Sequence, residues 1–437
     1  MSRLFEHDRM VDTVVSKKRP TVTIAQENDL QNLSYLNSIE KLKTMLRTNP
    51  EWEIMLCTSL IEAKQNAIDS GLKNMDLFAW PIDLRESNGY YQYLTDFSRW
   101  VPTEARSYSR PDYDEEIMFK LCHFYWLIDQ KTGLELQATQ DFEGNYPFAD
   151  WLVEFANDWG SFLNTTESIT TDSMQSFMDQ PLFGMNQYMI PEGNYTPSGN
   201  GATPNNPSKW LTFNQFFARE VLPGLRPITE MDNQTVVVAP ADAEYKKVYA
   251  INSQSQIVME DGVASDKTHR IKGSHAYSIN ELVGEEYGDR FANGKFVHSF
   301  LSPYDMHRFC APVKGKVLES KAIQGRVFLE VVITDGKFDA PDNAENGYEF
   351  KQTRGVLILE MENKELVAVI PIGMAQVSSV NMNASKGVNL YKGQEFGYFL
   401  FGGSDIIMLF QEDSQFKLNL GSEPKKQAGQ QFGTIQY

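Results

Sequence analysis

The hydrophobic pattern of this 437-residue chain changes near its middle, and that change constrains the fold more than any other feature. In the first half, apolar residues such as Phe148, Leu152 and Phe155 recur at helical spacing. In the second half, short β-branched or aromatic runs, among them residues 327–333 and 356–361, are separated by turn residues, as in strands. We therefore predict an α+β fold, with helices preceding a strand-rich half.

Residues 191–209 are rich in Pro, Gly, Asn and Ser, a composition typical of a linker or a long surface loop. We expect a helical N-terminal domain over residues 1–190 and a strand-rich domain over residues 210–437. Two glycine-containing turns of the second domain, at 311–317 and 386–397, resemble turns of barrel-sandwich folds. A carrier domain of that fold needs a modifiable lysine at a hairpin tip, and the sequence has no such turn.

Charge and composition exclude several classes of function. The net charge of −18 argues against nucleic acid and against broad adhesion to anionic lipid, because both need basic patches. No apolar run approaches the ~20 residues that span a bilayer, and the N-terminus lacks the apolar core of a signal peptide. Three scattered cysteines suit a reducing compartment, and no His, Cys and carboxylate cluster has metal-ligand spacing. We expect a cytoplasmic protein with no metal, and leave open a local basic rim for peripheral membrane contact.

A Gly402-Gly403-Ser404 turn lies between two apolar, strand-like runs near the C-terminus. Two glycines allow backbone conformations that are closed to other residues, so the turn can hold the Gly403 carbonyl against the Ser404 hydroxyl. A serine held in this way can attack the preceding carbonyl and cut the chain between residues 403 and 404. Most Gly-Gly-Ser turns are ordinary hairpin loops, so this interpretation depends on the remaining motifs.

Three further segments precede the turn. Residues 213–219 read Phe-Asn-Gln-Phe-Phe-Ala-Arg, residues 239–243 read Ala-Pro-Ala-Asp-Ala, and residues 301–310 read Leu-Ser-Pro-Tyr-Asp-Met-His-Arg-Phe-Cys. In this order, and with the Gly-Gly-Ser turn, the set resembles the phosphatidylserine decarboxylase family over residues 207–437. The aromatic spacing of the helical half resembles, more loosely, the N-terminal domain of fungal L-tryptophan decarboxylases of the same superfamily.

The resemblance implies a self-processing decarboxylase. Ser404 would attack the Gly403 carbonyl, and cleavage would leave a pyruvoyl group at the start of the new chain. That group would form a Schiff base with the substrate amine and accept the electron pair released with CO2. The resemblance assigns orientation of the processing base to Asp242 and the base itself to a histidine of a His-Arg-x-His motif. We expect His307 to transfer the proton during decarboxylation, because the ordinary pKa of imidazole suits work near neutrality.

The chain departs from the family pattern at the second histidine of that motif, where Cys310 stands. A thiol has a reference pKa of about 8.5, against about 6.5 for imidazole, and needs a positive neighbour such as Arg308 to act as a base. Three outcomes stay open: Cys310 is the base, His307 or His298 takes over, or the chain is a non-cleaving, non-catalytic homologue. A purely structural Cys310 is equally compatible with the sequence.

The substrate also stays open at this point. The family default is phosphatidylserine, which decarboxylation converts to phosphatidylethanolamine. The helical first half and the acidic, anchorless sequence favour an alternative, the decarboxylation of a free amino acid such as tryptophan. In both cases the partner would be a small molecule or phospholipid with a primary amine. The sequence is compatible with a homo-oligomer but does not determine the oligomeric state.

Overall fold

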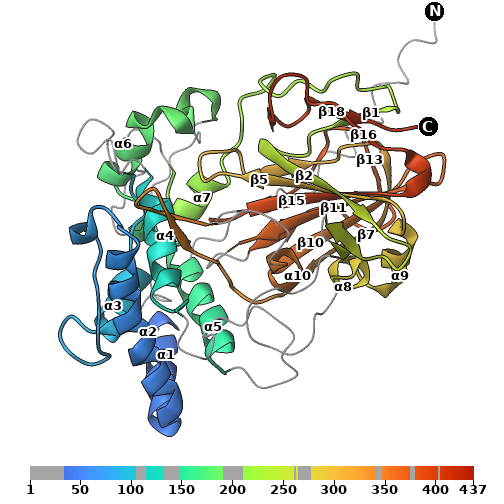
Figure 1. Ribbon diagram of the computed structural model, residues 1–437. Coiled ribbons are helices and arrows are strands. Elements are labelled where there is room, and N and C mark those ends of the chain that lie inside the picture. The colour runs from blue at the N-terminus through green and yellow to red at the C-terminus, as the bar shows by residue number, and fades with distance from the viewer. Residues whose placement is uncertain are drawn as a thin grey trace, which may run out of the picture.

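The computed structural model describes residues 34–104, 115–130, 147–189, 210–259, 262–263, 277–340, 347–374, 379–401 and 404–437. Helices dominate the first half and antiparallel sheets the second, so the α+β prediction is confirmed (Figure 1). The linker predicted over residues 191–209 lies outside the described residues. No described helix combines the length and the apolar character needed to cross a membrane.

The helical region packs around aromatic side chains. The predicted stripe of Phe148, Leu152 and Phe155 is buried on α5, which packs against α1. α6 begins with a reciprocal capping pair, because the side chains of Thr170 and Ser173 each bond the other residue's backbone N–H. The helices of this region are α1 (Ser34–Thr48), α2 (Pro50–Asp69), α3 (Tyr90–Ser98), α4 (Glu116–Trp126), α5 (Pro147–Phe162) and α6 (Thr171–Asp179).

A ten-stranded antiparallel sheet forms the centre of the second half, in the order β13-β7-β10-β11-β15-β5-β2-β3-β4, with β17 pairing beside β2. Its central strands β11 and β15 are buried along their whole length, because other elements cover both faces. The strands are β2 (Ala243–Ile251), β3 (Ile257–Met259), β4 (Gly262–Val263), β5 (Lys295–Leu301), β7 (Gly315–Ile323), β10 (Thr353–Glu360), β11 (Leu366–Gly373), β13 (Asn389–Leu390), β15 (Ser404–Phe410) and β17 (Lys425–Lys426).

Smaller sheets flank the large one, in the orders β1-β18-β16, β12-β14-β6 and β8-β9. Their strands are β1 (Val236–Val238), β6 (Arg308–Cys310), β8 (Val332–Thr334), β9 (Lys337–Asp339), β12 (Val380–Met382), β14 (Glu395–Phe399), β16 (Lys417–Leu418) and β18 (Gln431–Thr434). Short helices α7 (Phe213–Phe217), α8 (Ile279–Val283), α9 (Glu285–Gly288) and α10 (Tyr348–Lys351) join them. The strand predicted over residues 327–333 is wrong for residues 327–331, an irregular segment whose apolar side chains Val327, Phe328, Leu329 and Val331 are buried.

The two faces of the large sheet belong to different apolar cores. One face shares a continuous core with the helical region, which we call the helical face. Trp159 of α5 contacts Phe401 edge-on at 5.3 Å, and Asn214 bridges the two halves by accepting from Phe401 N–H at 3.1 Å and donating to Asn164 at 3.0 Å. The opposite face packs on residues of α8, α9 and α10.

Candidate active site

Ser404 is the first residue of β15 and pairs with Gly373 of β11 and Leu301 of β5. Its side chain lies on the helical face, because Leu301 and Ile406 belong to that core and side chains alternate along a strand. Ser404 is 0% exposed, and its Oγ has no hydrogen-bond partner among the described residues. Gly402 and Gly403 lie outside the described residues.

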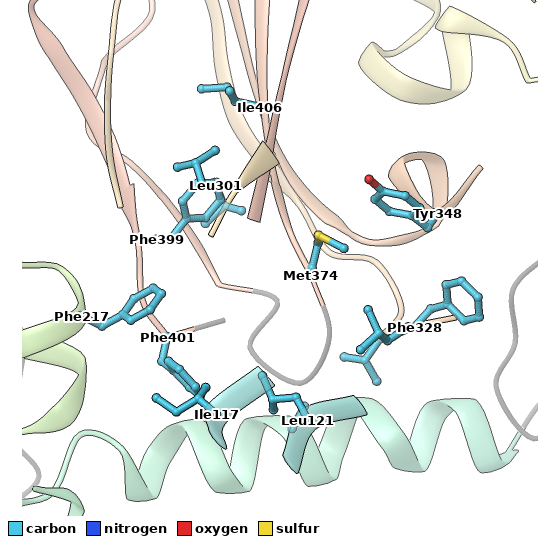
Figure 2. Close-up of a cluster of buried hydrophobic side chains, with 14 of the residues drawn as sticks. Ile117, Leu121, Phe217, Leu301, Phe328, Tyr348, Met374, Phe399, Phe401 and Ile406 are labelled. Carbon is cyan, nitrogen blue, oxygen red and sulfur yellow. The ribbon is translucent and has the colours of Figure 1, made fainter. Parts of the chain in front are cut away.

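Apolar side chains surround this end of the strand. Figure 2 shows Leu301, Phe399 and Ile406 on one side of the sheet, with Phe401 and Phe217 below them. Ile117 and Leu121 of α4 belong to the same cluster, so the helical region helps to enclose the serine. Such an environment excludes water and strengthens any electrostatic interaction inside it.

His307 lies just before β6 and is also completely buried. Its ring packs on Phe217, with ring centroids 3.9 Å apart, and its carbonyl accepts from Phe399 N–H at 2.8 Å. Neither ring nitrogen makes a well-formed hydrogen bond within the described part of the chain. Burial lowers the pKa of His307 well below its ordinary value, and the Arg219 guanidinium lowers it further. The imidazole is therefore neutral near pH 7, which is the form that can accept a proton, although burial makes it a weaker base than an exposed histidine.

Arg219 fixes the turn that leads into His307. Its buried guanidinium donates to the carbonyls of Tyr304 and Asp305 at 2.8 and 3.2 Å and stacks 4.3 Å from the ring centroid of Tyr188. One nitrogen, Nη2, donates to both carbonyls, and these two bonds tie the turn to the guanidinium. This arginine therefore helps to position the histidine, and its charge adds to burial in lowering the pKa of His307.

Asp242 and Cys310 lie together on a neighbouring part of the fold. Asp242 forms an ion pair with Arg226 at 2.5 Å and accepts from Ala428 N–H at 2.9 Å. The Cys310 thiol donates to the Ala239 carbonyl at 3.8 Å. Burial, followed by the negative charges of Asp242 and Glu395, raises the pKa of Cys310 to about 12. A thiol base needs the opposite shift, so this environment argues against Cys310 as the base.

The register of the sheet relates Asp242 to Ser404. Phe300 of β5 pairs with Glu244 of β2, and Leu301 pairs with Ser404. Asp242 therefore lies at the same end of the sheet as the serine but two strands away, which is roughly 10 Å at ordinary strand spacing. The structure thus brings the two predicted residues to one region without direct contact.

His298 lies on the opposite face of the sheet from Ser404. It pairs with Ile407, whose side chain belongs to the opposite core. Its Nε2 lies 3.2 Å from the Tyr348 hydroxyl and 3.4 Å from Asp405 Oδ1, and the same hydroxyl donates to Asp405 Oδ2. We call Asp405, Tyr348 and His298 the Asp405 network. The strand β15 separates the side chain of His298 from that of Ser404.

A family model for phosphatidylserine decarboxylase matches residues 213–434, a little over half of the chain. This chain belongs to the phosphatidylserine decarboxylase family. Phosphatidylserine decarboxylase proenzyme 2 of Oryza sativa is 31% identical over 204 residues, which cover 46% of this chain and 30% of the rice protein. The chain therefore corresponds to less than a third of that relative.

Two other relatives align over more of their own length. Phosphatidylserine decarboxylase proenzyme of Fusobacterium nucleatum is 29% identical over 262 residues, covering 60% of this chain and 74% of the relative. Decarboxylase iboD of Amanita muscaria is 25% identical over 274 residues, covering 58% of this chain and 74% of that relative. Both alignments cover more of the chain than the family model does. Since only three residues follow position 434, the similarity extends into the region before residue 213.

A pocket of about 480 Å³ lies on the Cys310 side of this family site. Residues 220–228 and strands β6 and β14 form its walls, and its polar lining includes Arg226, Arg308 and Glu395. Arg308 donates to Glu395 at 2.8 Å, so the cation near Cys310 is already paired with a carboxylate. Within the described residues, the lining includes Cys310 but neither Ser404 nor His307.

Sequence reasoning missed four residues of this region: Arg219, Arg226, Tyr348 and Asp405. Arg219 is the last residue of the 213–219 segment that the sequence singled out, so its positive charge was a usable signal, whereas Arg226 lies outside the three segments. Asp405 follows Ser404 directly, and an acidic residue at the start of an apolar strand was a second signal. Tyr348 is 57 residues from Asp405 in the sequence, and no local sequence pattern predicts the contact between them.

Proposed function

We propose that this chain is a self-processing, pyruvoyl-dependent decarboxylase that is cut between Gly403 and Ser404. The observation that carries the proposal is the Ser404 hydroxyl, which is fully buried and has no hydrogen-bond partner among the described residues. Burying a hydroxyl without a partner costs about 1–3 kcal/mol, and such groups in native structures call for an explanation, often a catalytic one. Attack on the preceding carbonyl is the reaction that this position offers.

The surroundings of Ser404 fit a pyruvoyl group made from it. Such a group would supply a conjugated ketone that accepts the electron pair released with CO2. The apolar side chains of Leu301, Phe399 and Phe401 would exclude water from it. His307, which faces the same core, would hold or deliver the proton that replaces CO2 on the substrate carbon.

We propose His307 as the processing base in place of the missing second histidine. Its neutral imidazole lies among residues of the core that Ser404 also enters, whereas the His298 ring lies across the sheet. Cys310 is disfavoured because burial and Asp242 raise its pKa to about 12. Asp242 would then act through position, since its contacts hold the turn at 239–243 to Arg226 and Ala428.

The proposed architecture follows the predicted domains. Residues 1–190 would form the helical domain and residues 210–437 the decarboxylase domain. The three-stranded sheets beside the ten-stranded sheet support a barrel-sandwich character for the second domain. The first-choice substrate is phosphatidylserine, which the names of several relatives contain.

One observation favours a second candidate, a free aromatic amino acid such as tryptophan. The core beside Ser404 is lined by aromatic rings from both halves: Phe401 contacts Trp159 at 5.3 Å, Phe213 at 4.8 Å and Phe217 at 5.1 Å. An indole ring would pack well in such surroundings.

The test is the mass of the purified full-length protein, followed by an assay of CO2 release. We expect a C-terminal fragment of residues 404–437 that carries a pyruvoyl cap, and CO2 from either phosphatidylserine vesicles or L-tryptophan. Release from one substrate only decides between the two candidates. An intact chain with an unmodified serine would contradict the proposal and indicate a non-cleaving homologue.

A further inference from the structure

The Asp405 network lies directly beneath the proposed cleavage site, on the other side of the sheet. Asp405 and Tyr348 are 0% and 3% exposed, and His298 is 0% exposed. The Tyr348 hydroxyl donates to one carboxylate oxygen of Asp405, and His298 Nε2 lies 3.4 Å from the other. In Figure 2, Tyr348 lies across the strands from Leu301 and Phe399. Both oxygens of this carboxylate therefore face a buried polar group on the non-catalytic side of β15.

Cleavage changes what holds this part of the chain. In the uncut protein Ser404 lies inside a continuous backbone, whereas after the proposed cut it is the first residue of a new chain. Chain ends fray unless contacts tie them down. Among the described residues, the pairing of β15 with β11 and β5 starts at Ser404, so the reactive residue lies at the end of the described strand.

Asp405 is the residue best placed to hold that new end. Its amide nitrogen is bonded to the Ser404 carbonyl, which is one of the two conjugated carbonyls of a pyruvoyl group. Side chains alternate across the strand, so Asp405 can be fixed on one face without occupying space on the other. Tyr348 and His298 come from α10 and β5, two elements that cleavage at residue 403 leaves intact.

We propose that the Asp405 network is an anchor that holds the new N-terminus in place after cleavage, with Asp405, Tyr348 and His298 as positioning residues. This inference rests on the proposed function, because it assigns the network a role only in the processed protein. The network carries out no chemical step. It fixes the strand from the face opposite the reaction, while His307 and the apolar side chains of the helical face contact the reacting group.

The test compares hydrogen exchange at the start of β15 in cut and uncut protein. Five full-length proteins are needed: wild type, Tyr348→Phe, Ser404→Ala, the double variant Ser404→Ala/Tyr348→Phe, and the control Tyr249→Phe. The mass of each protein is measured first to establish whether it is cut. Exchange is then followed by mass spectrometry in a peptide that covers residues 404–410. Tyr249→Phe serves as a matched control, because it also removes a tyrosine hydroxyl from the sheet but at a distance from Asp405. Tyr249 of β2 pairs with Phe296 of β5, whereas Asp405 pairs with Phe300, four residues further along β5.

In cut protein, Tyr348→Phe should speed exchange of these amides about tenfold or more, since it removes the buried hydrogen bond between the Tyr348 hydroxyl and the Asp405 side chain. In the uncut Ser404→Ala background the same change should alter exchange less than about twofold. Turnover should fall through kcat rather than KM, because the reacting group is misplaced while the substrate contacts remain. Asp405→Asn, which keeps the shape of the side chain, should reproduce both effects if Tyr348→Phe does not fold.

Three results would overturn the anchor. Equal acceleration in cut and uncut protein would make the network an ordinary structural element, and no acceleration in cut protein would remove its role. Acceleration by Tyr249→Phe of the same size would show a general loosening of the sheet. An uncut wild type is a separate result, visible in the first mass measurement, which refutes the proposed function and the anchor with it.

Discussion

At the first residues of β15, the two faces of the strand differ in the polar contacts that their side chains make. On the helical face, Ser404 and His307 have buried polar atoms without well-formed hydrogen bonds among the described residues. On the opposite face, Asp405 lies against Tyr348 and His298. Proteins satisfy buried polar groups unless a function requires otherwise. The Ser404 hydroxyl, which makes no hydrogen bond to a described residue, is therefore our candidate for the reactive group, and the hydrogen bond from Tyr348 to Asp405 supports the strand from the other face.

The comparison also distinguishes two buried histidines of the same half. His298 lies beside a carboxylate and a phenol, whereas His307 lies against the Phe217 ring and near the Arg219 cation. A histidine in the first environment is held in place, and one in the second is kept neutral. The four predictions below test this division, from the largest expected effect to the smallest.

Replacing the reactive hydroxyl should have the largest effect. Ser404→Ala removes the only proposed nucleophile, so we expect no cleavage at residue 403, as measured by the intact mass after long incubation. Ser299→Ala is the matched control, because Ser299 is a buried serine that pairs with Ile406 and faces the same core. Cleavage of Ser404→Ala at the wild-type rate would refute the assignment of the nucleophile.

Replacing the two histidines should give different kinds of loss. His307→Asn should slow cleavage and lower the rate of CO2 release by about 10²–10⁴-fold, the usual contribution of a general acid or base, with little change in stability at pH 7. His298→Asn should instead lower the free energy of unfolding by about 1–3 kcal/mol, because it breaks a buried hydrogen-bonded group. Rates come from CO2 assays and stabilities from urea unfolding. The reverse pattern would place the chemistry on the other face.

The free energy of unfolding should depend on pH through His307. Burial lowers its pKa in the folded protein, so below pH ~6.5 the unfolded chain binds a proton that the folded chain does not. The contribution of His307 to the free energy of unfolding is complete above pH ~6.5. It is lost as the pH falls, by up to about 1.4 kcal/mol per pH unit. His307→Asn should reduce this slope between pH 7 and 5, as measured by urea unfolding.

Other buried groups contribute to the slope that remains in that variant. His123 of the helical region has its pKa lowered by burial to about 3 and contributes with the same sign as His307. Glu104 has its pKa raised by burial to about 9 and contributes with the opposite sign. An unchanged slope in His307→Asn would mean that the imidazole near Ser404 is already protonated in the folded protein near pH 6.

Replacing the cysteine should have the smallest effect. Cys310→Ala removes a thiol whose pKa is raised to about 12, so cleavage should stay within about twofold of the wild-type rate. Cys310→His restores the family pattern and should preserve or speed cleavage. Cys122→Ala, at another buried cysteine, controls for the loss of packing. If Cys310→Ala stops cleavage in a folded protein, the thiol takes part in the reaction.

Part of the site could be predicted because its signals are local. Ser404 follows two glycines, and His307 stands in a segment with a recognisable order of residues. The partners could not be predicted, because they come from distant segments. Asp242 pairs with Arg226 from 16 residues away, and Asp405 contacts Tyr348 from 57 residues away. Strand order has the same origin, since β15 lies between β11 and β5 rather than beside its neighbour in sequence, β14.

The sequence by itself determined the α+β class, because helical and strand periodicities are written in consecutive residues. It also determined which serine, histidine and carboxylate were candidates. Only the tertiary structure decided that His298 and Ser404 lie on opposite faces. The physical reason is that side chains alternate along a strand, so the pairing register between β5 and β15 fixes which residues share a face.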